Sequence, residues 1–181
     1  IGCNYYVTSE RWLDNNLNEY PKSTHGSNGT HHYADTEAVR YGKQDGLEAL
    51  LQEVWDRYGI PIAITECHLG CTRDEQMRWL KECWEACNES AKKGIDIKGF
   101  TAWSLFGAYD WNSLLTRSEK FYEPGVFDVN EPGKARPTAV ANLVKSISTG
   151  TVIDHPLLME EGWWNKEKNK RIVSKNTPPV L

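Results

Sequence analysis

Three short apolar segments alternate with three helical patterns along this chain, and this alternation limits the possible folds more than any other feature of the sequence. The apolar segments, which we predict to be strands, are residues 1–7, 60–65 and 97–105. Strands that alternate with helices in this way form a parallel sheet with right-handed crossovers. The sequence therefore predicts an α/β fold in the order strand, loop, helix, strand, helix, strand, loop, helix.

The helices are predicted from the spacing of apolar side chains and from the signals at their ends. In residues 44–58 the spacing is that of an amphipathic helix, at Leu47, Leu50, Leu51, Val54, Trp55 and Tyr58. A second helix opens with a capping-box pattern from Thr72 to Glu75 and ends at Gly94. The third begins at Arg136-Pro137, because proline suits the first helical position. We expect its inward side chains to be Val140, Leu143, Val144 and Ile147.

Two long segments show no such periodicity. Residues 8–43 are polar and rich in Asn, Gly, Ser and His, which predicts a functional or disordered loop. Residues 151–181 are charged and end near Thr177-Pro178-Pro179, which indicates a strap or a linker. We accordingly expect one folded part over residues 1–150 and a tail over residues 151–181.

The predicted sheet is incomplete. Three parallel strands alone would leave both edge strands unpaired. The chain also lacks an initiator Met and opens at Ile1 in what looks like a strand already under way. We therefore expect a piece of a longer protein, with further strands upstream.

Charge and cysteine content argue against several kinds of partner. The formal net charge is −4 and there is no basic block, so neither a nucleic acid nor a membrane surface is an expected partner. The five cysteines fit neither a zinc ribbon nor a disulfide framework, which favours a reducing, cytoplasmic setting. Cys83 and Cys87 share a helix face and should pack as small apolar groups. The histidines and cysteines follow no known zinc pattern, so we expect no metal.

A carboxylate follows the middle strand. Glu66 stands in Ile64-Thr65-Glu66-Cys67-His68, and the carboxyl ends of parallel strands form the mouth where barrel enzymes carry their active sites. Such a glutamate is either functional or satisfied by an arginine or by backbone amides at the rim. The other strands end in Asn4-Tyr5-Tyr6 and in the segment from Trp103 to Trp111. Together these ends favour a site, and the aromatic rings suit a sugar, although such rings also serve as core or interface residues.

At these positions the chain resembles glycoside hydrolase family 1, the β-glucosidase family. The segments similar to the family's N-Y-Y, P-I-x-I-T-E, W-S-L-x-D-N-x-E-W and F-G-L-x-x-V-D motifs are residues 4–6, 61–66, 103–111 and 122–129. They occur in the family's order, and the resemblance covers about residues 1–148. It implies the C-terminal portion, about strands six to eight, of a (β/α)₈ TIM barrel.

The resemblance also implies roles for individual side chains. Glu66 would be the nucleophile of a retaining β-glycoside hydrolase, Tyr6 would orient it, and Asn4 would lie beside it to bind substrate. The sugar would be held by three further side chains: Trp103 as the floor of the subsite, with Asp110 and Trp111 binding hydroxyl groups. The expected partners are a carbohydrate substrate and either the missing N-terminal part of the barrel or a second chain. No cofactor is expected.

The chain departs from the family's pattern in several ways. The family's T-E-N-G becomes Thr65-Glu66-Cys67-His68, and the glutamate before the last tryptophan becomes Asp110. More importantly, the family's acid/base lies in an N-E-P motif after strand four. Asn130-Glu131-Pro132 spells these letters, but it follows the last strand, so we treat it as a coincidence. We expect the isolated fragment to lack glycosidase activity.

Three alternatives stay open at this point. The chain could belong to a non-catalytic carbohydrate-binding barrel that kept its aromatic floor. It could also be an accessory domain of a sugar-nucleotide oxidoreductase, because residues 66–73 and Gly162-Trp163-Trp164 resemble a subgroup fused to a dTDP-4-dehydrorhamnose reductase-type domain. That domain would start beyond Leu181. Finally, copies of the piece could associate to complete a barrel.

Overall fold

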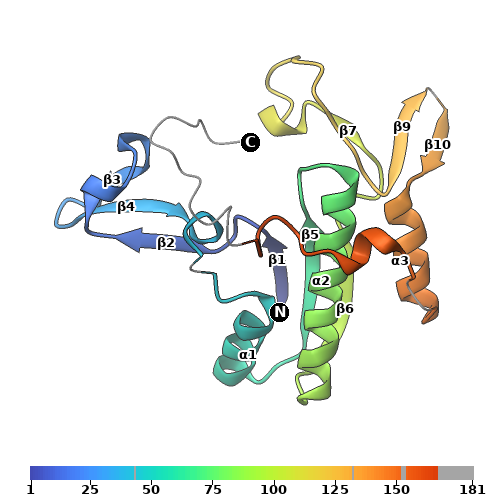
Figure 1. The fold of residues 1–181 in the computed structure, drawn as a ribbon, viewed down its shortest axis with the longest axis horizontal. Helices are drawn as coiled ribbons and strands as arrows, with labels where there is room; N and C mark the ends of the chain where they lie inside the picture. The colour runs from blue at the N-terminus through green and yellow to red at the C-terminus, as the bar shows by residue number, and fades with distance from the viewer. Residues whose placement is uncertain (43, 132, 152–153, 167–181) are drawn as a thin grey trace. The chain divides into compact units, whose positions relative to one another are not determined.

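The computed structural model describes residues 1–42, 44–131, 133–151 and 154–166, which form two compact units (Figure 1). The first unit takes residues 1–6 and 47–161. The second takes residues 7–46 and the segment that starts at residue 162. None of the helices in these ranges is long and apolar enough to cross a membrane.

The first unit is built on a parallel sheet of three strands. In the order in which they pair, these are β1 (Gly2–Tyr6), β5 (Ile62–His68) and β6 (Ile97–Ala102). The helices that alternate with them are α1 (Leu47–Tyr58), α2 (Arg73–Lys92) and α3 (Ala139–Thr149). The predicted alternation of parallel strands and helices is therefore confirmed, and Figure 1 shows α2 lying along β5 and β6.

The core of this unit lies between the sheet and its helices. Tyr5 of β1 stacks on Trp79 of α2, with ring centroids 5.3 Å apart. Ile62, Ile64 and Cys67 of β5 are almost completely buried, whereas Ala63 is only half-buried. In this chain only the face of β5 that α2 covers is buried.

The cysteines behave as predicted from their helix positions. All five are free thiols, and Cys67, Cys83 and Cys87 are buried together between β5 and α2. Burial raises the pKa of Cys83 well above its ordinary value and that of Cys87 to about 12. The thiols of Cys83 and Cys87 therefore stay protonated and pack as small apolar groups.

We expect this burial to separate the cysteines by reactivity. Because the thiolate is the reactive form, iodoacetamide at pH 8 should label exposed Cys71 first and half-buried Cys3 more slowly. The three buried thiols should react only after unfolding in urea. Peptide mass mapping over time measures this, and Cys71→Ser should remove the first labelled peptide. Early labelling of Cys83 in the native protein would contradict the prediction.

The ends of two strands differ from the sequence prediction. β5 continues to His68, so Glu66 lies inside the strand and not after it. β6 ends at Ala102, three residues before the predicted end. The apolar residues that follow, Leu105 and Phe106, are exposed and belong to the loop.

The capping of α2 and the start of α3 also differ from the prediction. Thr72 is the N-cap of α2, but its side chain makes no capping hydrogen bond, and Glu75 pairs with Arg78. α3 starts at Ala139, and Pro137 lies in a strand instead of at the first helical position. The reason is a β-hairpin ahead of the helix, which the sequence pattern did not reveal. Of the four side chains predicted to point inward on α3, Val140 and Leu143 are buried, while Val144 and Ile147 are half-buried.

Short strands fill the long loop between β6 and α3. They pair as two antiparallel hairpins, β7 (Ala108–Tyr109) with β8 (Tyr122–Glu123), and β9 (Phe127–Glu131) with β10 (Lys134–Pro137). A 3₁₀ helix, η4 (Trp111–Ser113), follows β7. This loop carries several of the predicted site residues.

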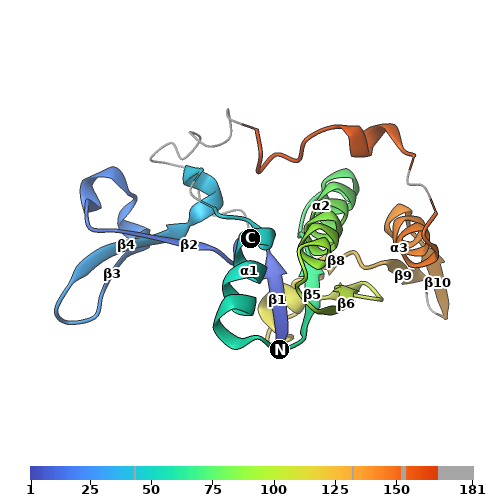
Figure 2. The same ribbon diagram turned by 90° about the horizontal axis from the view of Figure 1, so that it is seen from below.

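The second unit corrects the prediction for residues 8–43, which do contain regular structure. Their antiparallel sheet has the order β2 (Arg11–Asp14), β4 (His32–Glu37) and β3 (His25–Ser27), visible in Figure 2. Three 3₁₀ helices accompany it: η1 (Leu17–Glu19), η2 (Lys22–Thr24) and η3 (Ala38–Tyr41). The inward positions of β4 are Ala34 and Thr36, so the strand lacks the alternation of large apolar residues that would have predicted it.

The described part of the tail belongs to the first unit as far as residue 161. Its 3₁₀ helix, η5 (Pro156–Met159), lies beside α2, where Arg78 donates to the Leu157 carbonyl at 2.8 Å and pairs with Glu160. Thr177-Pro178-Pro179 lies outside the described residues. The boundary at residue 150 stays a prediction.

Candidate active site

A β-bulge in β5 sets the direction in which the side chain of Glu66 points. Two consecutive residues of β1 pair with Ile64 and Glu66, which leaves Thr65 without a partner in the ladder. The pairing with β6 shifts between Ile64 and Cys67. This is a β-bulge, which re-aims the side chains that follow it. Cys67 therefore takes the buried position after Ile64, and Glu66 points away from α2.

Tyr6 at the end of β1 binds Glu66 directly. Its hydroxyl donates a hydrogen bond to Oε2 of Glu66. Burial, this hydrogen bond and the negative charge of Glu66 raise the pKa of Tyr6 above its ordinary value. The phenol therefore stays protonated and remains a donor to the carboxylate. Two predicted site residues are thus brought together by the parallel pairing of their strands.

Asn4 also lies next to Glu66, because the two residues are paired in the register of β1 and β5. The hydroxyl of the bulged Thr65 donates to Oδ1 of Asn4 at 2.7 Å. Both side chains are exposed. The bulge residue therefore holds the Asn4 amide beside the candidate nucleophile.

Trp103 and Trp111 form an aromatic pair next to the end of β5. The Trp103 amide donates to the Cys67 carbonyl at 3.0 Å, which ties the end of β6 to the strand of Glu66. Its ring centroid lies 5.7 Å from that of Trp111, at an interplanar angle of 42°. Two aromatic rings in contact at a strand end offer flat apolar surface, and the predicted roles of Trp103 and Trp111 in binding a sugar stay predictions.

Asp110 is held by its own loop. Its Oδ1 accepts hydrogen bonds from the backbone amides of Glu119 and Phe121, at 3.1 and 2.9 Å. These bonds close the loop between β7 and β8. They also fix the backbone at Asp110, the residue directly before Trp111. The predicted role of Asp110 in binding a hydroxyl group stays a prediction.

Sequence reasoning missed two residues at this site, His68 and Glu123. The side chain of His68 is only 9% exposed. Its Nδ1 lies 2.9 Å from the Trp103 carbonyl oxygen, and its Nε2 lies 2.8 Å from Oε1 of Glu123. Its place two residues after Glu66 on one strand could have indicated it. In the part of the chain that the structure describes, no three His, Cys, Asp or Glu side chains are grouped to hold a metal ion.

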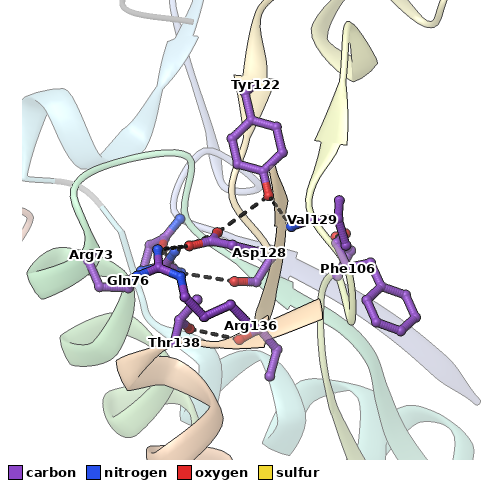
Figure 3. Close-up of polar contacts among 11 residues, drawn as sticks. Arg73, Gln76, Phe106, Tyr122, Asp128, Val129, Arg136 and Thr138 are labelled. Atoms are coloured by element: carbon purple, nitrogen blue, oxygen red, sulfur yellow. Dashed lines mark hydrogen bonds and ion pairs between the residues drawn. The ribbon is translucent and has the colours of Figure 1, made fainter. Parts of the chain in front are cut away.

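A buried aspartate anchors the segment that carries Glu123 (Figure 3). Asp128 accepts hydrogen bonds from Arg73 at 3.3 Å, from Arg136 at 2.9 Å and from the Tyr122 hydroxyl at 3.4 Å. Arg73, at the start of α2, also donates to the Gly125 carbonyl at 2.9 Å. The segment from β8 to β9 is therefore fixed to the N-terminal end of α2.

Comparison with solved structures defines the class of protein. The chain is similar to the β-glycosidase from Thermosphaera aggregans, with a TM-score of 0.51 and 25% identity over 62% of this chain and 23% of that one. It is also similar to the β-glucosidase from Pyrococcus furiosus, with a TM-score of 0.50 and 26% identity over 61% of this chain and 23% of that one. Both of these β-glycosidases have a TIM-barrel fold, and this chain is similar to about a quarter of each of them.

Sequence comparison gives the family. Aryl-phospho-β-D-glucosidase BglC of Bacillus subtilis is 26% identical over 61% of this chain, and β-glucosidase 47 of Arabidopsis thaliana is 24% identical over 73%. The profile of glycosyl hydrolase family 1 matches residues 1–137. The chain belongs to glycosyl hydrolase family 1, which confirms the resemblance. The matched regions make up 29% and 25% of these two relatives, so the chain spans less than a third of their length.

Proposed function

We propose that the chain forms strands six to eight of a (β/α)₈ barrel that hydrolyses a β-glycoside with retention, and that Glu66 is its nucleophile. The observation that carries this proposal is the hydrogen bond from Tyr6 to Glu66 at the carboxyl ends of parallel strands, in a chain of family 1. A carboxylate at that mouth, oriented by a protonated phenol, is suited to nucleophilic attack.

In this mechanism Tyr6 holds Oε2 of Glu66, and Oε1 attacks the anomeric carbon. The bond from that carbon to the leaving oxygen breaks, and a glycosyl-enzyme ester forms. A second carboxyl group, about 5–5.5 Å from the first, gives a proton to the leaving oxygen and then activates the water that hydrolyses the ester. Trp111 was expected to bind hydroxyl groups, but because its ring packs on Trp103 we assign both rings to the floor under the sugar. Asn4 and Asp110 bind the hydroxyl groups of the sugar.

The second carboxyl group is assigned to the remainder of the barrel. Glu131 lies at the end of β9, in the hairpin with β10, and we do not assign it this role. The partners in this proposal are therefore a carbohydrate substrate and the other strands of the barrel. The isolated chain is expected to lack activity, because retention requires both groups.

Covalent trapping tests the assignment of Glu66. A 2-deoxy-2-fluoroglycoside with a dinitrophenolate leaving group slows hydrolysis of the intermediate more than its formation, so the ester accumulates. We expect the full-length protein, treated with glucosyl and galactosyl reagents in turn, to gain one fluorosugar on the peptide that contains Glu66. The Glu66→Gln variant should gain none.

Two results would count against this function. Labelling of a different carboxylate would remove Glu66 from the role of nucleophile. Absence of any label, together with measurable binding of the intact glycoside, would favour a carbohydrate-binding barrel without catalysis.

A further inference from the structure

The side chain of His68 connects three segments of the first unit. It stands at the end of β5, two residues after Glu66, and its Nδ1 lies 2.9 Å from the Trp103 carbonyl oxygen after β6. Its Nε2 lies 2.8 Å from Oε1 of Glu123 in β8. The side chains are only 9% and 21% exposed, so water competes little for these contacts. The imidazole therefore fixes these three segments relative to one another.

The ring makes one hydrogen bond and one close contact with a carboxylate. A carbonyl oxygen only accepts, so Nδ1 of His68 donates to the Trp103 carbonyl. Nε2 lies 2.8 Å from Oε1 of Glu123, although this contact does not have the geometry of a hydrogen bond. A ring that is held at one nitrogen and packed against a carboxylate at the other is limited in its orientation, which is what a positioning residue requires.

Glu123 extends this connection to the second tryptophan of the site. In the β7–β8 hairpin Glu123 pairs with Ala108, and the chain continues from β7 through Asp110 to Trp111. The segment around Glu123 is itself anchored to α2 through Asp128 and Arg73. Contacts from His68 therefore reach both members of the Trp103–Trp111 pair, one through a backbone carbonyl and the other through a hairpin.

We propose that His68 and Glu123 form a positioning pair that sets the place of the Trp103–Trp111 floor relative to Glu66, and so determines how tightly the sugar is bound. The inference rests on the proposed function, since it takes Glu66 as nucleophile and the tryptophans as the floor. His68 touches neither the reacting carbon nor Glu66 in this proposal. Its loss should therefore weaken binding of the glycoside more than it slows the chemical step.

The test is the concentration dependence of fluoroglycoside trapping in the full-length protein. His68→Phe keeps a ring of similar size but loses both the hydrogen bond to Trp103 and the ionic contact with Glu123. We expect it to need about tenfold more reagent for the half-maximal rate of labelling, with the maximal rate within about twofold of the unchanged protein. His68→Asn places an amide nitrogen near the position of Nδ1, so it can still donate to Trp103 and should give an intermediate shift. His31→Phe, in an exposed turn, is the matched control and should change neither value.

The outcomes separate this inference from the function on which it rests. Absence of label on Glu66 in the unchanged protein overturns both. Labelling of Glu66 with the same half-maximal concentration in His68→Phe overturns the positioning pair alone. A smaller amount of labelled protein at an unchanged half-maximal concentration also overturns it, because that is the effect of lost folding. If His68→Phe fails to fold, His68→Asn and Glu123→Gln decide by the same measurement, and an unshifted concentration in both overturns the proposal.

Discussion

The substitution Glu66→Gln is expected to reduce hydrolysis of an aryl β-glycoside by the full-length protein by at least about a thousandfold. The amide has almost the shape of the carboxylate and its oxygen can still accept the hydrogen bond from Tyr6. It cannot, however, form the ester at the anomeric carbon. Release of nitrophenol measures the rate, and kcat should fall much more than KM changes.

A matched control separates this effect from a general loss of negative charge. Glu53 lies on α1 with a side chain that is 67% exposed, so Glu53→Gln should leave the rate within about twofold. Azide gives a second check on Glu66→Ala, because the small anion can enter the space left by the carboxylate and attack the same face of the sugar. We expect an α-glycosyl azide, identified by proton NMR. A β-glycosyl azide would instead assign Glu66 as the acid/base.

The second large effect is expected on stability. Asp128→Ala should lower the free energy of unfolding by about 3 kcal/mol, because it removes the carboxylate that accepts hydrogen bonds from two arginines and a tyrosine in a partly buried site. Asp128 is only 8% exposed and binds Arg73, Arg136 and Tyr122. Urea unfolding of the full-length protein, followed by tryptophan fluorescence, measures the change.

The control for this substitution is an ion pair on the surface of α2. Glu89 pairs with Lys92, and the side chains are 51% and 70% exposed. Glu89→Ala should therefore change the free energy of unfolding by less than about 1 kcal/mol. Equal effects of the two substitutions would show that the Asp128 network does not hold the β8–β9 segment.

The parallel sheet and its helices could be predicted from the sequence because they are encoded locally. The apolar spacing of α1 reports which face of the helix is buried, and the apolar run before Glu66 indicates a strand in the core. The meeting of Tyr6 with Glu66 follows once the strands are parallel neighbours, since their carboxyl ends then lie at one edge. The sequence therefore indicated the principal contact of the candidate site.

Other features depend on contacts that no local pattern reports. The strands of residues 8–43 bury small or hydroxylated side chains, so their pattern looks like that of a loop. Glu123 reaches His68 only because the β7–β8 hairpin folds back over 55 residues of chain separation. The polar anchor at Asp128 likewise joins α2 to a segment more than 50 residues later. Such long-range partners become visible only in the folded chain.

The unpaired Thr65 has a consequence for how the carboxylate of this site is kept out of the core. If the same residues of β5 ran without the bulge, strict alternation would place Glu66 on the face of Ile62 and Ile64, against α2 and the buried thiols. Deletion of Thr65 would leave Glu66 on its present face and Cys67 in the core, but it would remove the hydroxyl that donates to Asn4. In this strand the orientation of the candidate nucleophile therefore depends on the pairing register as well as on the glutamate itself.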